Sequence, residues 1–184
     1  MTLKACATVT DAPRFHLQPS QALLRLELWG NLAAVSKRFK AAFGVALPAA
    51  SRAVSADDLR VIWREPMAFM IAAPAASAQD VSARLTEVAK GDGAVTDISG
   101  AAVCCSLAGP DWPVLLTQGG VFDAEDPAFA PGYVAGTVVE HINIRIDVMS
   151  ETQADVYVAP SYARDLLGYW DSVAGSLSVK SPTA

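Results

Sequence analysis

The sequence is short of the residues that most often carry chemistry. It has two histidines and three cysteines among 184 residues. Lysine and arginine number 14 against 19 aspartate and glutamate, which gives a formal net charge of −5. Affinity for phosphate backbones comes largely from clustered basic side chains. This charge balance therefore argues against nucleic acid as a partner.

Long hydrophobic runs are absent as well. No segment approaches the roughly 20 apolar residues that a helix needs to cross a bilayer. No long apolar core follows Lys4, so the first residues do not resemble a signal peptide. An odd number of cysteines without a secretion signal predicts reduced thiols. We therefore expect a soluble, cytoplasmic protein with no membrane partner.

The composition that is present describes a well-packed globular protein. Hydrophobic residues make up 52% of the chain and charged residues 18%. A chain of 184 residues fits one domain, or one compact unit built from two halves. The basic cluster of Lys37, Arg38 and Lys40 is interpreted as the solvated face of a helix.

Hydrophobic periodicity places a first unit between residues 21 and 99. Residues 22–30 alternate as a half-buried strand does, and Asn31 can cap a helix that stops at Gly44. Two apolar runs then suggest antiparallel strands, Ser77 can cap a second helix that ends before Gly91, and a short strand follows. This order is that of a split βαβ, ferredoxin-like unit.

A second unit is predicted over residues 100–175, in a similar order. It contains a strand, a helix with Pro110 and Pro113 in its first turn, a loop, three strands and a last helix capped by Ser161. Residues 1–20 are expected to be an irregular arm and residues 176–184 a flexible tail. The predicted fold class is α+β, with two ferredoxin-like βαββαβ-type halves packed together.

The stretch GAVTDISGAAVCCSLAGP offers the strongest local candidates for a site. A phosphate loop would need its glycines between a strand and the following helix, but Gly91 follows a helix and Gly93 precedes a strand. Gly91, Gly93 and Gly100 are therefore interpreted as a helix stop and strand turns. Cys104 and Cys105 are neighbours on a strand and point to opposite faces, which disfavours a shared metal and favours burial.

The remaining candidates are also interpreted as structural. His16 and His141 lie in no partner motif, and there is no GxSxG nucleophile motif. The acidic loop of Asp123, Glu125 and Asp126 lacks the spacing of a calcium loop. We expect the aromatic residues to be core or interface anchors; they include Trp63, Phe69, Trp112 and Tyr133. The sequence thus predicts no catalytic, cofactor-binding or metal site in this chain, which is typical of a subunit or scaffold.

Five short motifs follow one another between residues 93 and 172: GAVTDIS, SLAGPDWPVLLTQGG, FDAEDPAFAPG, YVAGT and DVYVAPSYARDLLGYW. In this order they resemble the gamma subunit family of heterotetrameric sarcosine oxidase. Gly119-Gly120 departs from it, because a Gly-Cys pair is common there. The matching residues are Val95, Asp97, Ile98, Ser99, Leu107, Gly109, Pro110, Ala128, Phe129, Pro131, Gly132, Pro160, Ser161, Tyr162 and Ala163.

The resemblance implies a role in an enzyme complex. Such a complex oxidises sarcosine to glycine with oxygen, yields hydrogen peroxide and passes the one-carbon unit to tetrahydrofolate. FAD, FMN and NAD belong to the larger alpha and beta subunits and zinc to the delta subunit. By implication this chain is an accessory subunit with no cofactor of its own, and its partners are alpha, beta and delta.

The resemblance leaves a second hypothesis open. The gamma subunit is similar to the folate-binding aminomethyltransferase fold, so the chain is alternatively a free-standing folate-dependent aminomethyltransferase. That activity needs a carboxylate to hold the pterin, and Asp97 is the only one carried by a motif. We interpret Asp97 as the anchor of a turn before Ser99. A third alternative is a diverged relative that binds a partner of another type.

Overall fold

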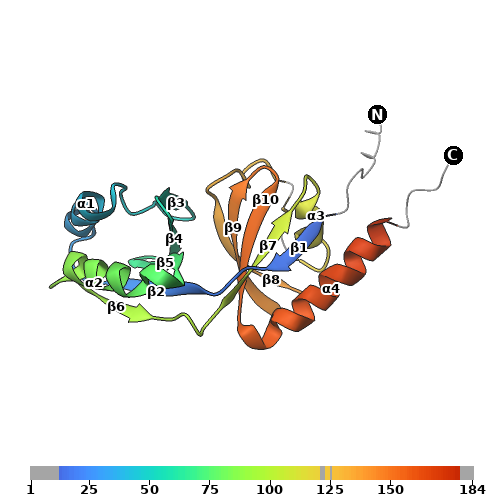
Figure 1. Ribbon diagram of the computed structural model, residues 1–184. Helices are drawn as coiled ribbons and strands as arrows, with labels where there is room; N and C mark the ends of the chain where they lie inside the picture. The colour runs from blue at the N-terminus through green and yellow to red at the C-terminus, as the bar shows by residue number, and fades with distance from the viewer. Residues whose placement is uncertain (1–12, 121–122, 125, 179–184) are drawn as a thin grey trace.

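The computed structural model describes residues 13–120, 123–124 and 126–178. These residues form two five-stranded antiparallel sheets that face each other, with helices on the two outer sides (Figure 1). The first sheet, with its helices, makes one half of the molecule and the second sheet makes the other half. None of the helices in the described residues is long and apolar enough to cross a membrane.

The first half has the ferredoxin-like order predicted for it, plus one extra edge strand. The strand order is β3-β4-β5-β2-β6, and α1 and α2 pack on one face. Its elements are β2 (Gln21–Leu28), α1 (Leu32–Phe43), β3 (Ala53–Ala56), β4 (Leu59–Glu65), β5 (Ala68–Pro74), a 3-10 turn (Ala75–Ser77), α2 (Ala78–Ala89) and β6 (Gly93–Asp97).

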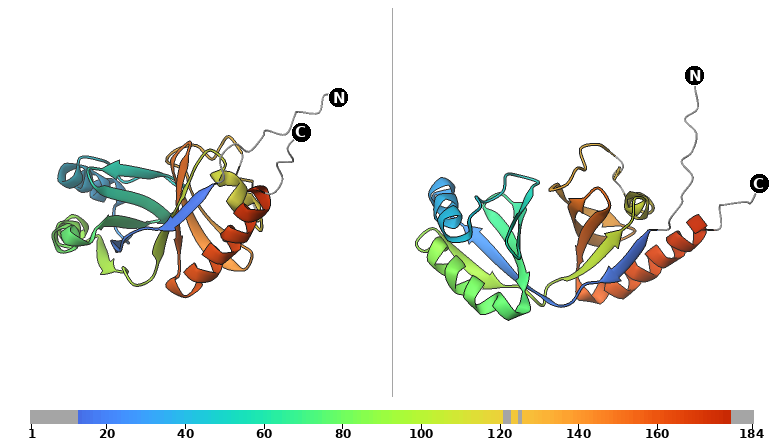
Figure 2. Two further views of the ribbon diagram at one scale, coloured as in Figure 1. Left: turned by 45° about the vertical axis from the view of Figure 1, so that its right-hand side comes forward. Right: turned by 45° about the horizontal axis from the view of Figure 1, so that its top comes forward.

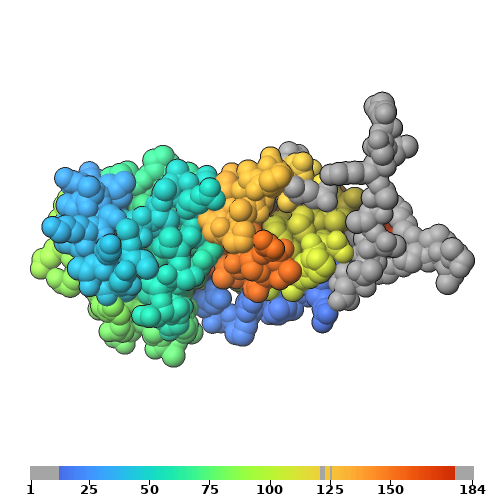
Figure 3. All heavy atoms as spheres, turned by 90° about the horizontal axis from the view of Figure 1, so that it is seen from above, coloured from blue at the N-terminus to red at the C-terminus, as the bar shows by residue number. Residues whose placement is uncertain are grey.

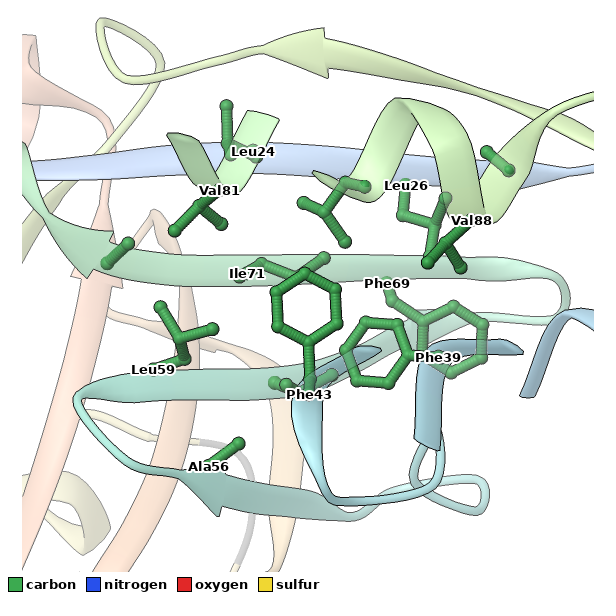
Figure 4. Close-up of a cluster of buried hydrophobic side chains, with 14 of the residues drawn as sticks. Leu24, Leu26, Phe39, Phe43, Ala56, Leu59, Phe69, Ile71, Val81 and Val88 are labelled. Atoms are coloured by element: carbon green, nitrogen blue, oxygen red, sulfur yellow. The ribbon is translucent and has the colours of Figure 1, made fainter. Parts of the chain in front are cut away.

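The core of this half forms because one face of β2 and one stripe of each helix are apolar (Figure 4). Leu24 and Leu26 point from β2 towards Phe39 of α1 and Val81 of α2. As predicted, α1 is capped by Asn31, whose Oδ1 accepts a hydrogen bond from Ala34 N at 3.1 Å. The helix ends at Gly44, which has a φ of 80° that glycine adopts without strain.

The second half has the same strand arrangement as the first, except that one strand comes from a different place in the chain. Its sheet order, β8-β9-β10-β7-β1, corresponds strand by strand to β3-β4-β5-β2-β6, so β1 occupies the place of β6. The N-terminal strand therefore completes the C-terminal sheet. The elements are β1 (Arg14–Leu17), β7 (Val103–Ala108), α3 (Trp112–Thr117), β8 (Val134–Val139), β9 (Ile142–Ser150), β10 (Gln153–Val158) and α4 (Pro160–Ser178).

Trp170 of α4 lies at the centre of the second core. It is fully buried, and its Nε1 donates to the carbonyl of Leu115 on α3 at 3.1 Å. The ring of Phe15 on β1 lies 6.1 Å from the Trp170 ring. The side chains of α4, α3 and β1 thus share one core, although β1 is distant in sequence.

The structure differs from the sequence prediction near both ends of the chain. The irregular arm expected over residues 1–20 is wrong for Arg14–Leu17, which pairs with β7. The last helix begins at Pro160, before the expected cap Ser161, and reaches Ser178, so residues 176–178 are helical. Residues 1–12 and 179–184 lie outside the described residues.

Smaller corrections concern element starts. β3 has no counterpart among the elements predicted from the sequence, because its four residues carry almost no pattern. Ser77 does not cap α2 with its side chain; its Oγ donates to the carbonyl of Pro74 at 3.1 Å. Pro113 lies in the first turn of α3 as expected, whereas Pro110 lies before the helix.

The two halves also meet directly at their β3 and β8 edges. Ala53 N donates to the carbonyl of Gly132 at 2.9 Å, and Val134 N donates to the carbonyl of Ser51 at 3.0 Å. Viewed from above, the segments of the first half adjoin those around β8 and β9 (Figure 3). Arg52, which precedes β3, bridges to Tyr133, which precedes the corresponding strand β8. Equivalent edges of the two sheets are therefore joined.

Candidate functional site

Polar side chains that the sequence patterns do not single out lie between the two sheets. One apolar cluster contains residues of both inner faces, among them Leu23 and Ile62 of the first sheet and Cys104 and Tyr157 of the second. Figure 2 shows the two sheets on either side of the middle of the molecule, and this cluster lies between them. Polar side chains lie beside it.

Arg60 of β4 and Asp147 of β9 form an ion pair across the two sheets. Arg60 Nε donates to Asp147 Oδ2 at 2.7 Å and Nη2 donates to Oδ1 at 2.5 Å. The Asp147 side chain is 0% exposed and the Arg60 side chain 15%. A bidentate pair of this kind fixes direction as well as distance, so it sets how the two halves sit on each other.

Burial governs the protonation of this pair. It raises the pKa of Asp147, and the hydrogen bonds from Arg60 oppose that change. Burial by itself lowers the pKa of Arg60, but the hydrogen bond and the charge of Asp147 outweigh it, so the pKa of Arg60 is raised. The guanidinium stays charged, and Asp147 depends on it as a counter-ion.

A second buried carboxylate lies on the neighbouring strand. Asp155 of β10 accepts a hydrogen bond from Ser106 Oγ, and Ser106 in turn accepts one from Gln18 Nε2 at 2.6 Å. Gln18 belongs to the segment between β1 and β2 that connects the two halves. The network therefore fastens this connection to the inner face of the second sheet.

A pocket of about 290 Å³ is lined by Arg60 of the ion pair and by Asp155. Asp57 and Asp58 of the β3–β4 turn and Gln21 of β2 also line it. No group of three His, Cys, Asp or Glu side chains within the described residues is arranged to hold a metal ion. The pocket brings carboxylates together around an arginine that is already paired with Asp147.

The two cysteines of β7 lie where strand geometry predicts. Cys104 faces the layer between the sheets and Cys105 faces the second core, and both are buried. Burial raises the pKa of Cys105 to about 11 and that of Cys104 further. Both thiols are therefore held in their neutral, unreactive form at physiological pH.

The other candidates are spread over the molecule. His16 is exposed on β1, and His141 is exposed in the turn between β8 and β9. Asp123 and Asp126 are exposed on the loop before β8, and Glu125 lies outside the described residues. Gly91 has a φ of 83° just after α2, as a helix stop requires.

Asp97 anchors a turn, as the sequence predicts. Its Oδ1 accepts from Ser99 N at 2.9 Å and from Ser99 Oγ at 2.6 Å, and Ser99 Oγ accepts from Leu23 N at 3.1 Å. These hydrogen bonds lower the pKa of Asp97. The motif carboxylate is thus used to tie the β6–β7 connection to β2.

Sequence reasoning missed Arg60, Asp147 and Asp155. A strand that alternates apolar and polar residues is normally interpreted as exposing its polar face to solvent. Here the polar face of β9 is covered by the first sheet, and Asp147 is buried. The available signal was aspartate within two adjacent strands, since aspartate is depleted in strands.

Residues 30–176 match the model of the family described as "Sarcosine oxidase, gamma subunit family". No curated protein matches the chain.

Solved structures show where else this fold occurs. The chain is similar to a chain of the heterotetrameric sarcosine oxidase from Corynebacterium sp. U-96, with a TM-score of 0.79 and 20% identity over 94% of this chain and 88% of that one. It is also similar to the glycine cleavage system aminomethyltransferase T from Bartonella henselae, with a TM-score of 0.63 and 20% identity. That match covers 86% of this chain but 45% of the transferase chain. At such identities, the likeness shows the fold.

Proposed function

This chain belongs to the sarcosine oxidase, gamma subunit family, and from that membership we propose that it is the accessory gamma-type subunit of a heterotetrameric flavoenzyme complex. The family match over residues 30–176 carries the proposal. The fold likeness to a chain of a heterotetrameric sarcosine oxidase supports it, because it extends over 94% of this chain.

In this proposal the complex oxidises sarcosine to glycine with oxygen, forms hydrogen peroxide and passes the one-carbon unit to tetrahydrofolate. FAD, FMN, NAD and zinc are held by the alpha, beta and delta subunits. Two properties of this chain fit a supporting role. Its β7 thiols are buried and neutral, and the Arg60–Asp147 pair serves to join its own two halves.

The start of α1 offers a surface for a partner. Trp29 is 67% exposed and Leu32, three residues further on, is 39% exposed. Aromatic side chains are enriched in the buried centres of interfaces, and tryptophan is enriched among the residues that contribute most to binding. We assign Trp29 and Leu32 to the contact with a partner subunit.

Co-expression with the alpha, beta and delta chains of a heterotetrameric sarcosine oxidase, followed by size-exclusion chromatography, tests the proposal. We expect this chain to elute with the other three, well ahead of its own 19.3 kDa. Elution only as a free 19.3 kDa chain, while the other three assemble, would contradict it.

The likeness to aminomethyltransferase T keeps a second candidate, a free-standing folate-dependent aminomethyltransferase. The chain spans less than half of that transferase, and Asp97 is engaged by Ser99 in a turn. Calorimetry of the isolated chain with tetrahydrofolate separates the two candidates. An accessory subunit gives no micromolar binding by itself, whereas a transferase does.

A further inference from the structure

Two arginines from the facing sheets share a pocket at the opposite end of β4 from the Arg60 pair. The pocket measures about 240 Å³ and lies among β4, β5, β9, β10 and the β6–β7 connection. Arg64 of β4 and Arg145 of β9 line it together with Asn143. Apolar residues complete the lining, among them Met70, Ile98 and Ile144.

A break in the strand register directs Arg64 to this place. The pairing of β4 with β5 shifts between Trp63 and Glu65, so Arg64 is the extra residue of a β-bulge. Bulges re-aim side chains and are often found beside functional sites. The Nε of Arg64 is buried and has no hydrogen-bond partner in the described residues.

Arg145 is held close to this second positive charge. Burial lowers the pKa of Arg145, and the charge of Arg64 lowers it further. The charge of Glu65 raises the pKa of Arg145, but Glu65 already forms an ion pair with Arg25 at 3.0 Å. Opposite Arg145 on β8 lies Gly136, where an added Cβ would come within 3.7 Å of Arg145 Nη2.

The same two strands provide an internal contrast. Arg60 of β4 is paired with the carboxylate of Asp147 on β9, whereas Arg64 of β4 lines the same pocket as Arg145 of β9. Partly buried cations are normally paired. Within the described residues, two such cations line this pocket, and no carboxylate is among its lining residues.

We propose that this pocket binds a carboxylate, with Arg64 and Arg145 as the charged ligands and the Asn143 amide as a further hydrogen-bond donor. The guanidinium fork matches the two oxygens of a carboxylate, and an anion between the two cations removes their repulsion. The apolar lining accepts a small apolar body attached to the carboxylate. This inference does not depend on the proposed complex.

The test uses the full chain and thermal unfolding in sodium acetate or sodium malonate against sodium chloride at equal ionic strength. Binding to the folded state alone raises the Tm with carboxylate concentration. We expect a saturable rise for the natural chain. The Arg145→Gln and Arg64→Gln variants should weaken the apparent affinity about tenfold or more, as expected for loss of a charge-assisted hydrogen bond.

The ligand-free variants give a second readout. Because each variant removes a like-charge contact, its Tm in chloride should equal or exceed that of the natural chain. A structural arginine would show the reverse. Lys37→Gln, which removes a charge from the exposed face of α1, is the control and should keep the full response.

Two results would overturn the proposal: no carboxylate-specific rise in the natural chain, or an undiminished rise in both arginine variants. Repeating the titration on the assembled complex identifies the source of the carboxylate. A retained response indicates a free small carboxylate, and a lost response indicates an acidic side chain of a partner in the same pocket.

Discussion

The Arg60–Asp147 pair is a buried ion pair that joins the two halves. Asp147 has no exposed surface, and its carboxylate receives two hydrogen bonds from one guanidinium. Breaking a buried pair by removing one partner leaves an uncompensated charge, whereas replacing both partners by apolar residues is often tolerated. The pair therefore specifies how the sheets meet more than it stabilises them.

Arg60→Met should lower the free energy of unfolding by about 3–5 kcal/mol, because Asp147 then remains buried without its counter-ion. The double variant Arg60→Met, Asp147→Leu should regain most of this loss. Urea unfolding followed by circular dichroism measures both. A double variant that is less stable than Arg60→Met would show that the pair itself is the source of stability.

The exposed carboxylate of Asp97 and the partly buried carboxylate of Asp92 contribute to stability in a way that depends on pH in acid. The hydrogen bonds from Ser99 lower the pKa of Asp97, and those from Arg38 and Asn31 lower the pKa of Asp92. Because the folded pKa lies below the ordinary value of 3.8, the unfolded chain binds more protons in acid. Their stabilising effect is present above that value and is lost as the pH falls through the folded pKa.

Asp97→Asn should therefore flatten the loss of stability between about pH 5 and pH 2. Urea midpoints measured across this range for the natural chain and the variant show the difference. Asp171→Asn, at an exposed position of α4, controls for the change in net charge. A variant whose midpoints run parallel to those of the natural chain would contradict the role given to Asp97.

The positions of individual side chains were predicted well where local geometry decides them. Neighbouring positions on a strand placed Cys104 and Cys105 on opposite faces, and the Asp97–Ser99 turn follows from two residues close in sequence. Arg60 and Asp147 are 87 positions apart. Their pairing depends on how two sheets stack, which strand periodicity does not specify.

At the scale of elements, β1 shows most clearly where local pattern is insufficient. Its four residues, RFHL, are too few to display a period, and Pro13 and Pro19 flank them. The strand is stabilised instead by pairing with β7 and by Phe15 packing near Trp170. Longer elements such as β2, α1 and α2 were predicted closely, because eight or more residues reveal their periodicity.

Removal of residues 1–17 should destabilise the second half and expose the edge of β7. A bare edge strand presents unpaired backbone groups and promotes association between copies. We expect this truncated chain to form oligomers in light scattering, while a chain that lacks only residues 1–12 retains β1 and stays monomeric. Equal behaviour of the two truncations would show that β1 is dispensable.

At the scale of the whole molecule, the N-terminal strand and the two connections interlock the halves. The chain enters through β1 in the second sheet, builds the first half, and returns through residues 98–102 to build the rest of the second. The first sheet comes from one continuous segment, residues 21–97, whereas the second sheet includes β1 from before that segment. A rigid two-sheet body of this kind suits a subunit that presents a fixed surface to partners.

Substitution of Trp29, at the start of α1, tests whether this part of the surface contacts the partners. Trp29→Ser should weaken binding to the partner chains about 30-fold or more, as expected for a tryptophan at the centre of an interface. Surface plasmon resonance with the alpha, beta and delta chains immobilised measures the effect. Tyr162→Ser, at an exposed aromatic of α4, is the matched control, and equal binding by Trp29→Ser and the natural chain would move the interface elsewhere.

Native mass spectrometry of the four co-expressed chains tests the central claim most directly. We expect one assembly that contains this 19.3 kDa chain together with alpha, beta and delta, with flavin and zinc retained when this chain alone is removed. The contradicting result is an assembly of the other three chains only, with this chain present solely as a free species at its own mass.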